Sequence, residues 1–166
     1  GGVGLILCQR AKHRGARVIG TVSTEQKAEA ARQAGADEVI LYTQVDFAEE
    51  AKRLTDGRGV DVIYDAVGKD TFLKGFDCLR ARGMMASYGA ASGAIEPLDT
   101  GVLSRGSYFL TRAGLAAYTA GRGELRKRGG EVFAMVGSGA VNLHIFGEYP
   151  LSEAAKGHVQ MEGRET

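Results

Sequence analysis

The stretch Gly1-Gly2-Val3-Gly4 decides the fold, and LILCQRAKHRG follows it directly over residues 5–15. Leu5, Cys8 and Ala11 recur at helical spacing, so we expect a helix directly after the glycines. Glycines at the start of a helix let a backbone approach a phosphate closely, and the amide groups there attract an anion. The stretch therefore predicts the second half of a dinucleotide-binding turn.

A short buried strand is predicted over residues 17–22, after Gly15 ends the helix. The order is thus glycine turn, helix, strand. In a doubly wound sheet, a further strand feeds into the glycine turn. Because the sequence begins inside the turn, we interpret the chain as a piece of a longer protein.

The bulk composition describes an ordinary globular domain. The chain has 166 residues, of which 44% are hydrophobic and 25% charged. A net charge of +1 does not indicate binding to nucleic acid or to an anionic membrane. No apolar run reaches the roughly 18 residues of a membrane helix, and no signal peptide is visible. We therefore expect a cytoplasmic protein without nucleic-acid or membrane partners.

The cysteines and histidines predict no metal site. Cys8 and Cys78 lack CxxC spacing and lie among apolar residues, which is typical of buried thiols in a reducing compartment. The histidines are far apart in sequence, and none has a ligand-like neighbour. They are His13, His144 and His158.

Strands and helices alternate along the whole chain. The strands are short and nearly continuous in apolar residues, which is typical of a parallel sheet covered on both faces. Right-handed crossovers then give an α/β doubly wound, Rossmann-type sheet, here without its first strand. We predict strands at 17–22, 39–42, 60–65, 83–88 and 106–111, an extended piece near 141–146, and helices at 27–33, 47–54, 72–79, 115–136 and 152–161. Glycines at 121–123 and 129–130 leave the continuity of the longest helix open.

Ligands of such a sheet lie outside the carboxyl ends of the strands. Small residues, hydroxyls and glycine gather there, which suits a cofactor lying across these ends. Asp65 ends one strand and could orient loops or cofactor. The predicted ends are 21–23, Tyr42, 65–68, 87–89 and 109–111.

The residues around the second strand end favour NADP over NAD. An NAD enzyme usually places an acid about 20 residues after the glycines, but here that position falls on residues 21–23. Ser23 and Lys27 instead offer a hydroxyl and a cation one helical turn apart, and Tyr42 can reach the same place. These groups fit a 2′-phosphate. Glu25, in the same turn, would repel that phosphate unless it points away.

An ordered series of short segments resembles the zinc-free quinone oxidoreductases, the zeta-crystallin-like branch of the medium-chain dehydrogenase/reductase superfamily. The resemblance covers nearly the whole chain, up to residues 149–155. The series consists of Gly1-Gly2-Val3-Gly4, 19–23 with Lys27, 34–36, 64–68 and 88–89.

The resemblance implies a Rossmann-type cofactor domain over residues 1–166, with a barrel-like catalytic domain that is absent from this chain. It implies NADPH as the cofactor and a quinone or related enone as the acceptor. Implied positions are Gly1, Gly2 and Val3 at the pyrophosphate; Ser23, Lys27 and Tyr42 at the 2′-phosphate; Val67 and Gly68 at the adenosine-side ribose and bridge; and Tyr88, Gly89, Ala90, Ser107 and Phe109 at the nicotinamide half.

Two further expectations concern chemistry and assembly. No general acid is evident, and a quinone can take its protons from solvent. The strand 106–111 would be the edge of the sheet, and unpaired edges invite partners. Because cofactor domains of this superfamily commonly pair edge to edge, we predict a homodimer through this strand.

Two other functions stay open at this point. The chain could be a nucleotide-binding module without catalysis. It could also belong to an enoyl reductase or alcohol dehydrogenase branch of the same superfamily.

Overall fold

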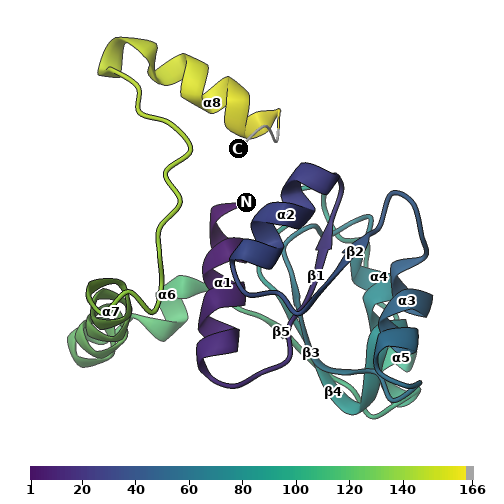
Figure 1. Ribbon diagram of the computed structural model, residues 1–166. Helices are drawn as coiled ribbons and strands as arrows, with labels where there is room; N and C mark the ends of the chain where they lie inside the picture. Colours follow the sequence, from purple (N-terminus) through teal and green to yellow (C-terminus); the bar gives the residue numbers. More distant parts are fainter. Residues whose placement is uncertain (164–166) are drawn as a thin grey trace. The chain divides into compact units, whose positions relative to one another are not determined.

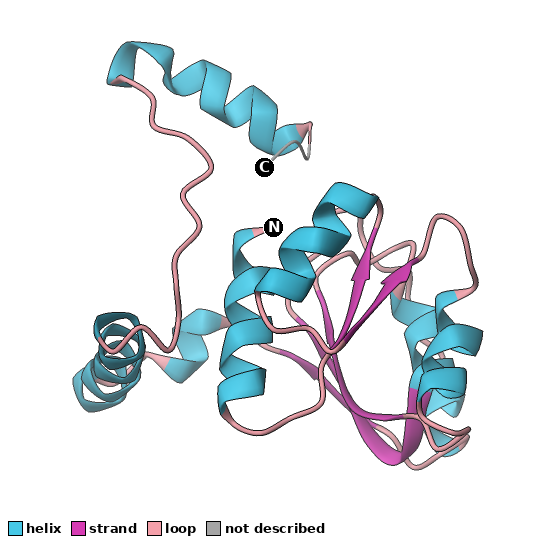
Figure 2. Ribbon diagram, viewed as in Figure 1, coloured by secondary structure: helices cyan, strands magenta, loops and turns pink. Residues whose placement is uncertain are grey.

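The computed structural model describes residues 1–163, and it divides into two compact units (Figure 1). One unit contains residues 1–39 and the segment from residue 129 onward, and the other contains residues 40–128. Figure 2 shows strands and helices alternating along the chain, as the sequence predicts.

The first unit begins with helix, strand and helix. Its elements are α1 (Gly2–His13), β1 (Ile19–Val22), α2 (Glu25–Gln33), the start of β2 (Glu38–Leu41), most of α7 (Arg122–Gly137), η2 (Leu151–Glu153) and α8 (Ala154–Glu162). β1 and β2 form a two-stranded sheet. Gly20 of β1 faces the small side chains of Ala31 and Ala36, and a Cβ added to Gly20 would lie 3.7 Å from each. Small residues thus let α2 pack closely on the strand.

The second unit contains a three-stranded parallel sheet in the order β3-β4-β5. Its elements are α3 (Phe47–Leu54), β3 (Val60–Asp65), α4 (Phe72–Gly75), η1 (Phe76–Cys78), β4 (Leu79–Ser87), α5 (Gly101–Ser104), β5 (Phe109–Arg112) and α6 (Leu115–Tyr118). The core is a cluster of Phe72, Phe76, Leu79 and Met85. The parallel pairing confirms the parallel sheet predicted from the apolar strands.

Several predicted boundaries were wrong. The helix expected over 72–79 is one α-turn followed by a 3₁₀ turn, because Leu79 already pairs with Val60 as the first residue of β4. Residues 141–146 form no strand. The helix predicted over 115–136 is interrupted after Tyr118, but α7 continues through both glycines at 129–130. Strong helix formers flank these glycines, and Glu124 pairs with Arg128 at 3.0 Å.

Strand β3 is less covered than its sequence suggests. Within the described residues it pairs with β4 and lies at one edge of the three-stranded sheet. Val62 and Tyr64, two residues apart on the same face, are 41% and 58% exposed. β5 lies at the other edge, as predicted, and its Phe109 is 57% exposed.

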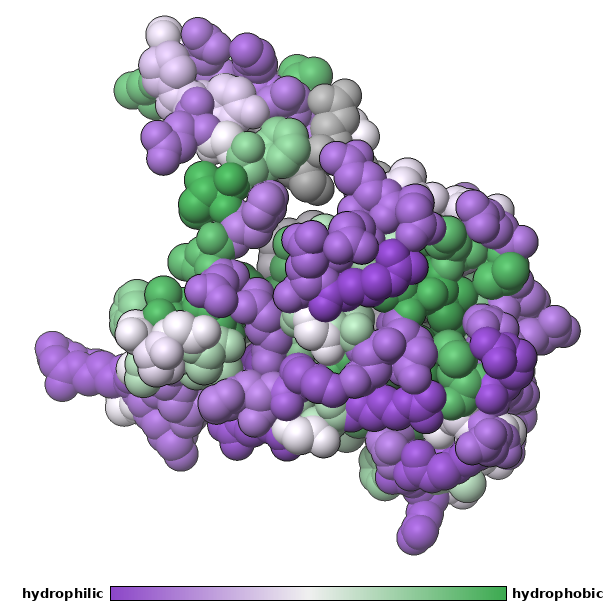
Figure 3. Space-filling model, viewed as in Figure 1, coloured by the Kyte–Doolittle hydropathy of each residue, from purple (hydrophilic) through white to green (hydrophobic). Residues whose placement is uncertain are grey.

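The surface drawn in Figure 3 is largely hydrophilic, with hydrophobic side chains in smaller groups between the polar ones. Within residues 1–163, no helix combines the length and the apolar character needed to cross a bilayer.

Candidate functional site

The amino terminus of α1 is open to an anion. The first helical hydrogen bond runs from the Leu5 amide to the Gly1 carbonyl at 3.1 Å, so the amides of residues 2–4 precede the helical ladder. Gly1 is the N-cap residue and provides no side-chain cap. Apart from chain neighbours and the backbone of α1 itself, no atom of the described residues lies within 4 Å of a Cβ built on Gly1, Gly2 or Gly4. The helix dipole and these amides together fit a phosphate group.

A second positive group lies in the same unit. Lys27 is in the first turn of α2, where its amide donates to the Thr24 hydroxyl at 3.3 Å. Thr24 is therefore the helix cap, and Ser23 directly precedes it. Burial, and then the Lys27 ammonium, lower the pKa of the Gly1 amino group. Lys27 is thus close enough to the start of α1 for its charge to be felt there.

Glu25 is paired with a cation of its own helix. Its carboxylate accepts from the Arg32 guanidinium at 2.9 Å, further along α2. The pair offsets part of the Glu25 charge, although the same guanidinium also lies 3.6 Å from the Glu29 carboxylate. Tyr42, the third residue predicted for the 2′-phosphate, is half-buried in the turn that directly follows β2.

Asp65 organises the carboxyl end of β3 in the second unit. The side chain is only 6% exposed, and it accepts from the amides of Val67 and Gly68. The Val67 amide lies 3.3 Å and the Gly68 amide 3.1 Å from the carboxylate oxygen that accepts from it. The Thr71 hydroxyl donates to the same carboxylate at 2.6 Å. Asp65 therefore fixes the turn that contains two of the predicted cofactor residues.

The loops after β3 and β4 fit tightly against each other. Gly68 has φ +86°, and its added Cβ would lie 2.9 Å from the Ala90 Cα. The Cβ of an alanine at Gly89 would lie 2.5 Å from the Ala66 carbonyl oxygen. The Tyr88 amide donates to the Asp65 carbonyl at 2.9 Å. The structure thus brings five predicted residues together at the carboxyl ends of β3 and β4: Val67, Gly68, Tyr88, Gly89 and Ala90.

Ser107 and Phe109 lie at the opposite end, which corrects the expectation that they join Tyr88 and Gly89. Phe109 is the first residue of β5 and pairs with Met84. It therefore lies about 10 Å along the strand from the carboxyl end, where ligands of such a sheet bind. The strand begins later than predicted because Ser107 adopts a left-handed backbone, with φ 52°. The carboxyl end of β5 is instead Arg112, which pairs with Ser87.

Arg112 was missed in the sequence analysis because the strand was expected to end one residue earlier. Its guanidinium Nη1 donates to the Ser87 hydroxyl at 3.2 Å, and Ser87 itself is 1% exposed. Both residues line a cavity of about 500 Å³. The other lining residues are Phe72, Ala90, Ala94, Ile95, Leu98 and Leu110.

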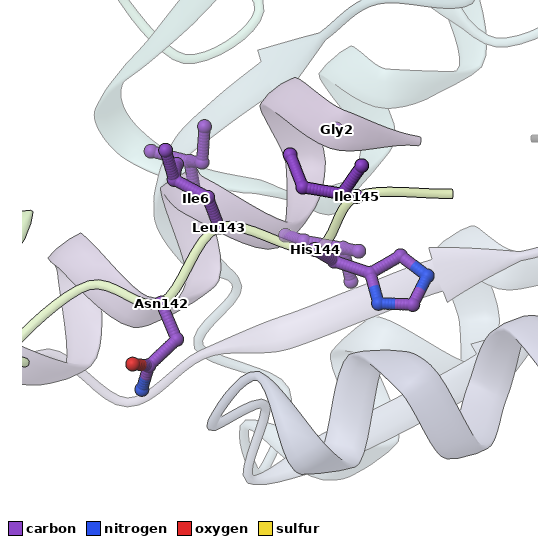
Figure 4. A pocket seen from close by; sticks show the side chains of 7 residues that line it. Gly2, Ile6, Asn142, Leu143, His144 and Ile145 are labelled. Atoms are coloured by element: carbon purple, nitrogen blue, oxygen red, sulfur yellow. The ribbon is translucent and has the colours of Figure 1, made fainter. Parts of the chain in front are cut away.

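A smaller cavity of about 140 Å³ lies beside α1 in the first unit. Figure 4 shows residues 142–145 running alongside the helix, with Leu143 next to Ile6. Gln9 holds this segment: its side-chain amide donates to the Asn142 carbonyl at 3.0 Å and accepts from the Asn142 amide at 2.7 Å. Nothing in the sequence pattern indicated this role of Gln9.

Comparisons with known proteins agree with this arrangement. The chain is 48% identical to a 2-haloacrylate reductase of Burkholderia sp and 44% identical to quinone oxidoreductase 1 of Escherichia coli (strain K12). All of the chain is covered in both comparisons, together with 50% and 52% of the two relatives. The chain therefore spans about half the length of the curated relatives it matches.

The solved structures confirm the fold class. The Escherichia coli quinone oxidoreductase complexed with NADPH matches with a TM-score of 0.94 at 44% identity, over 100% of this chain and 52% of that one. A mycobacterial protein, Rv1454c, complexed with NADPH, matches with a TM-score of 0.95 at 43% identity, over the same shares. The α/β Rossmann-type architecture predicted from the sequence is thus confirmed.

A family model described as "Zinc-binding dehydrogenase" matches residues 2–125. In the part of the chain that the structure describes, no three His, Cys, Asp or Glu side chains are grouped as metal ligands would be. The matched region covers most of the chain and contains both sheets and the open glycine turn. The chain therefore belongs to the zinc-binding dehydrogenase family.

Proposed function

We propose that this chain is the NADPH-binding domain of an oxidoreductase that transfers hydride to a quinone or a related enone. The observation that carries the proposal is the uncapped glycine start of α1, where the amides of residues 2–4 precede the helical ladder. The names of the similar proteins support it, since they include quinone oxidoreductases complexed with NADPH. Both compact units would then be parts of one cofactor-binding domain, with catalysis depending on a further domain.

The residues present fit the cofactor. Gly1, Gly2 and Val3 would lie along the pyrophosphate, where the amides that precede the helical ladder would donate to it. Ser23, Lys27 and Tyr42 would hold the 2′-phosphate. Val67 and Gly68 would border a ribose, and Tyr88, Gly89 and Ala90 would face the nicotinamide half. When bound, NADPH supplies the hydride.

The chain's own residues orient and shield the reactants. Asp65 and Thr71 hold the turn at Gly68, so the backbone there keeps one position. No side chain in this proposal acts as a general acid, and the reduced acceptor takes its proton from solvent. Tyr64 and Tyr88 are assigned no role in proton transfer.

Two alternatives remain specific enough to test. A non-catalytic nucleotide-binding module would bind NADPH but reduce nothing even as the full-length protein. An alcohol dehydrogenase branch is favoured by a solved NAD-dependent alcohol dehydrogenase at 30% identity and a TM-score of 0.82. That branch would bind zinc and prefer NADH, and an enoyl reductase would turn over enoyl thioesters faster than quinones.

The test is a fluorescence titration of the full-length protein with NADPH and NADH. We expect NADPH to bind roughly tenfold more tightly, which corresponds to about 1.4 kcal/mol. Lys27→Ala should remove that preference without weakening NADH. The matched control is Lys127→Ala, an exposed lysine of α7. Equal affinities in the parent protein, or an unchanged preference in Lys27→Ala, would overturn the proposal.

We also propose a cytoplasmic homodimer that pairs through β5. The edge position of β5 and the exposure of Phe109 support the pairing. Cys8 and Cys78 are both free rather than paired in a disulfide, which fits a reducing compartment. Light scattering should show a dimer that Phe109→Lys or Leu110→Pro shifts toward monomer. A parent protein that is already monomeric would remove the pairing.

A further inference from the structure

The cavity at the carboxyl ends of β4 and β5 has the features of a small-molecule site. Its volume of about 500 Å³ lies within the range of about 300–1,000 Å³ that is usual for ligand pockets. Apolar side chains form most of the wall, among them Phe72, Ile95 and Leu98. Only two polar side chains line it, Ser87 and Arg112. An apolar wall with few polar groups fits a conjugated organic molecule with one recognised oxygen.

Arg112 is placed and charged for that oxygen. It is two residues after Leu110 on β5, so both side chains lie on the same side of the strand, and both line the cavity. Ser87, which is buried, accepts from Nη1 at 3.2 Å and so fixes one edge of the guanidinium. Among the described residues, no carboxylate lies within ion-pair distance of Arg112, whereas Arg105 pairs with Asp77. The other donors of the guanidinium are available to a ligand.

The cavity also lies where the cofactor reaction would occur. Ala90 lines it, and Ala90 belongs to the loop that faces the nicotinamide half in the proposed function. In open α/β sheets, ligands bind outside the carboxyl ends of the strands, and Ser87 and Arg112 are the last residues of their strands. Arg112 is itself exposed, and its guanidinium both donates to a buried hydroxyl and lines the cavity.

We propose that this cavity binds the acceptor and that the Arg112 guanidinium holds its conjugated carbonyl or carboxylate oxygen. The inference rests on the proposed function. The acceptor gains a hydride, with its two electrons, at a carbon conjugated to that oxygen, and the reduced nicotinamide supplies it. The π electrons move onto the oxygen, and the oxyanion then takes a proton from water. Arg112 stabilises the oxygen more strongly as its negative charge grows.

The test measures binding and turnover separately in the full-length protein. The protein is first saturated with oxidised NADP, which binds but donates no hydride. Calorimetry then gives the Kd of 2-chloroacrylate, a carboxylate, and of 1,4-naphthoquinone, a neutral carbonyl. The variants are Arg112→Met, Arg112→Lys and the cavity-filling Ala94→Phe. The matched control is Arg126→Met, an exposed arginine of α7.

We expect Arg112→Met to raise the Kd of chloroacrylate at least about tenfold, because a charge-assisted hydrogen bond is lost. The same variant should raise the Kd of naphthoquinone less than that of chloroacrylate, because the naphthoquinone oxygen becomes charged only during reduction. It should lower kcat/KM by a similar factor for both acceptors. Arg112→Lys should recover part of both losses. Ala94→Phe should weaken both acceptors, and NADPH affinity should stay unchanged in all four variants.

Several results would overturn the proposal. One is an Arg112→Met variant whose Kd and kcat/KM stay within about twofold of the parent for both acceptors. Another is unchanged acceptor binding in Ala94→Phe, which would place the acceptor elsewhere. A parent protein that does not bind NADPH would instead contradict the proposed function, and the titration of the parent reveals this before any variant is made.

Discussion

The Asp65 carboxylate offers the sharpest test of what stabilises the turn at the carboxyl end of β3. It is buried, and it accepts from two backbone amides and one hydroxyl in the turn that follows β3. The perturbation is Asp65→Asn, which keeps the size of the side chain but replaces one acceptor oxygen by a donor. Asp65→Ala removes both oxygens.

The expected magnitude follows from the contacts. In Asp65→Asn, the amide oxygen can still accept from Gly68, where the carboxylate distance is 3.1 Å. The amide nitrogen then faces the Thr71 hydroxyl, which can turn to accept. The variant loses the charge assistance and the weak Val67 contact, so we expect about 1–2 kcal/mol of destabilisation. Asp65→Ala leaves all three donors without this acceptor, and we expect it to lower the free energy of unfolding by about 3–5 kcal/mol.

The assay is urea unfolding of the full-length protein combined with amide hydrogen exchange over residues 65–72. Exchange at Val67 and Gly68 should accelerate in both Asp65 variants. Asp70→Asn is the control, because Asp70 is exposed on the same loop, and we expect an effect within about 0.5 kcal/mol. If Asp65→Ala were as stable as this control, or if exchange in the loop were unchanged, the carboxylate would not be what holds the turn.

Two further predictions concern the stability of the fold. Hydrogen bonds from Arg58 and a second arginine lower the pKa of Asp61 from 3.8 to about 2, so its contribution is present above pH 3.8 and is lost as the pH falls toward 2. Thermal unfolding of Asp61→Asn should show a smaller loss of stability over that interval than the parent. Gly89→Ala should cost about 1–3 kcal/mol, because its Cβ would meet the Ala66 carbonyl oxygen at 2.5 Å. Gly130→Ala has open space around it in α7 and should be neutral or stabilising by up to about 1 kcal/mol. If urea unfolding showed Gly130→Ala to be less stable than Gly89→Ala, the packing argument would be refuted.

The parts of the fold that depend on local pattern could be predicted from the sequence. The α3 helix has the predicted bounds of residues 47–54, because apolar residues at helical spacing and a polar cap define it. The parallel sheet followed from runs of apolar residues alternating with helices. The role of Asp65 in orienting a loop was expected from its place at a strand end. In each case, neighbouring residues contain the information.

Contacts between distant residues could not be predicted in this way. Whether Glu25 opposes a phosphate depends on Arg32, seven residues on, whose guanidinium pairs with it. The position of residues 142–145 depends on the Gln9 side chain, 133 residues from Asn142. The Gln9–Asn142 contact leaves no periodic pattern in the sequence, because it depends on side-chain orientation after folding, whereas Glu25 and Arg32 lie about two helical turns apart on α2.

The error at β5 shows why site residues are harder to predict than the strands that carry them. The strand has four residues, so an error of two or three residues in its start moves a side chain from one end of the sheet to the other. The left-handed Ser107 delays the start, and a non-glycine residue in that conformation gives no signal in the sequence. Phe109 thus lies at the amino end, and Arg112 takes the place at the ligand edge that had been assigned to uncharged residues. The consequence is chemical: a guanidinium at the carboxyl end of β5 offers a positive charge to an oxyanion, which none of the residues originally assigned to the nicotinamide half does.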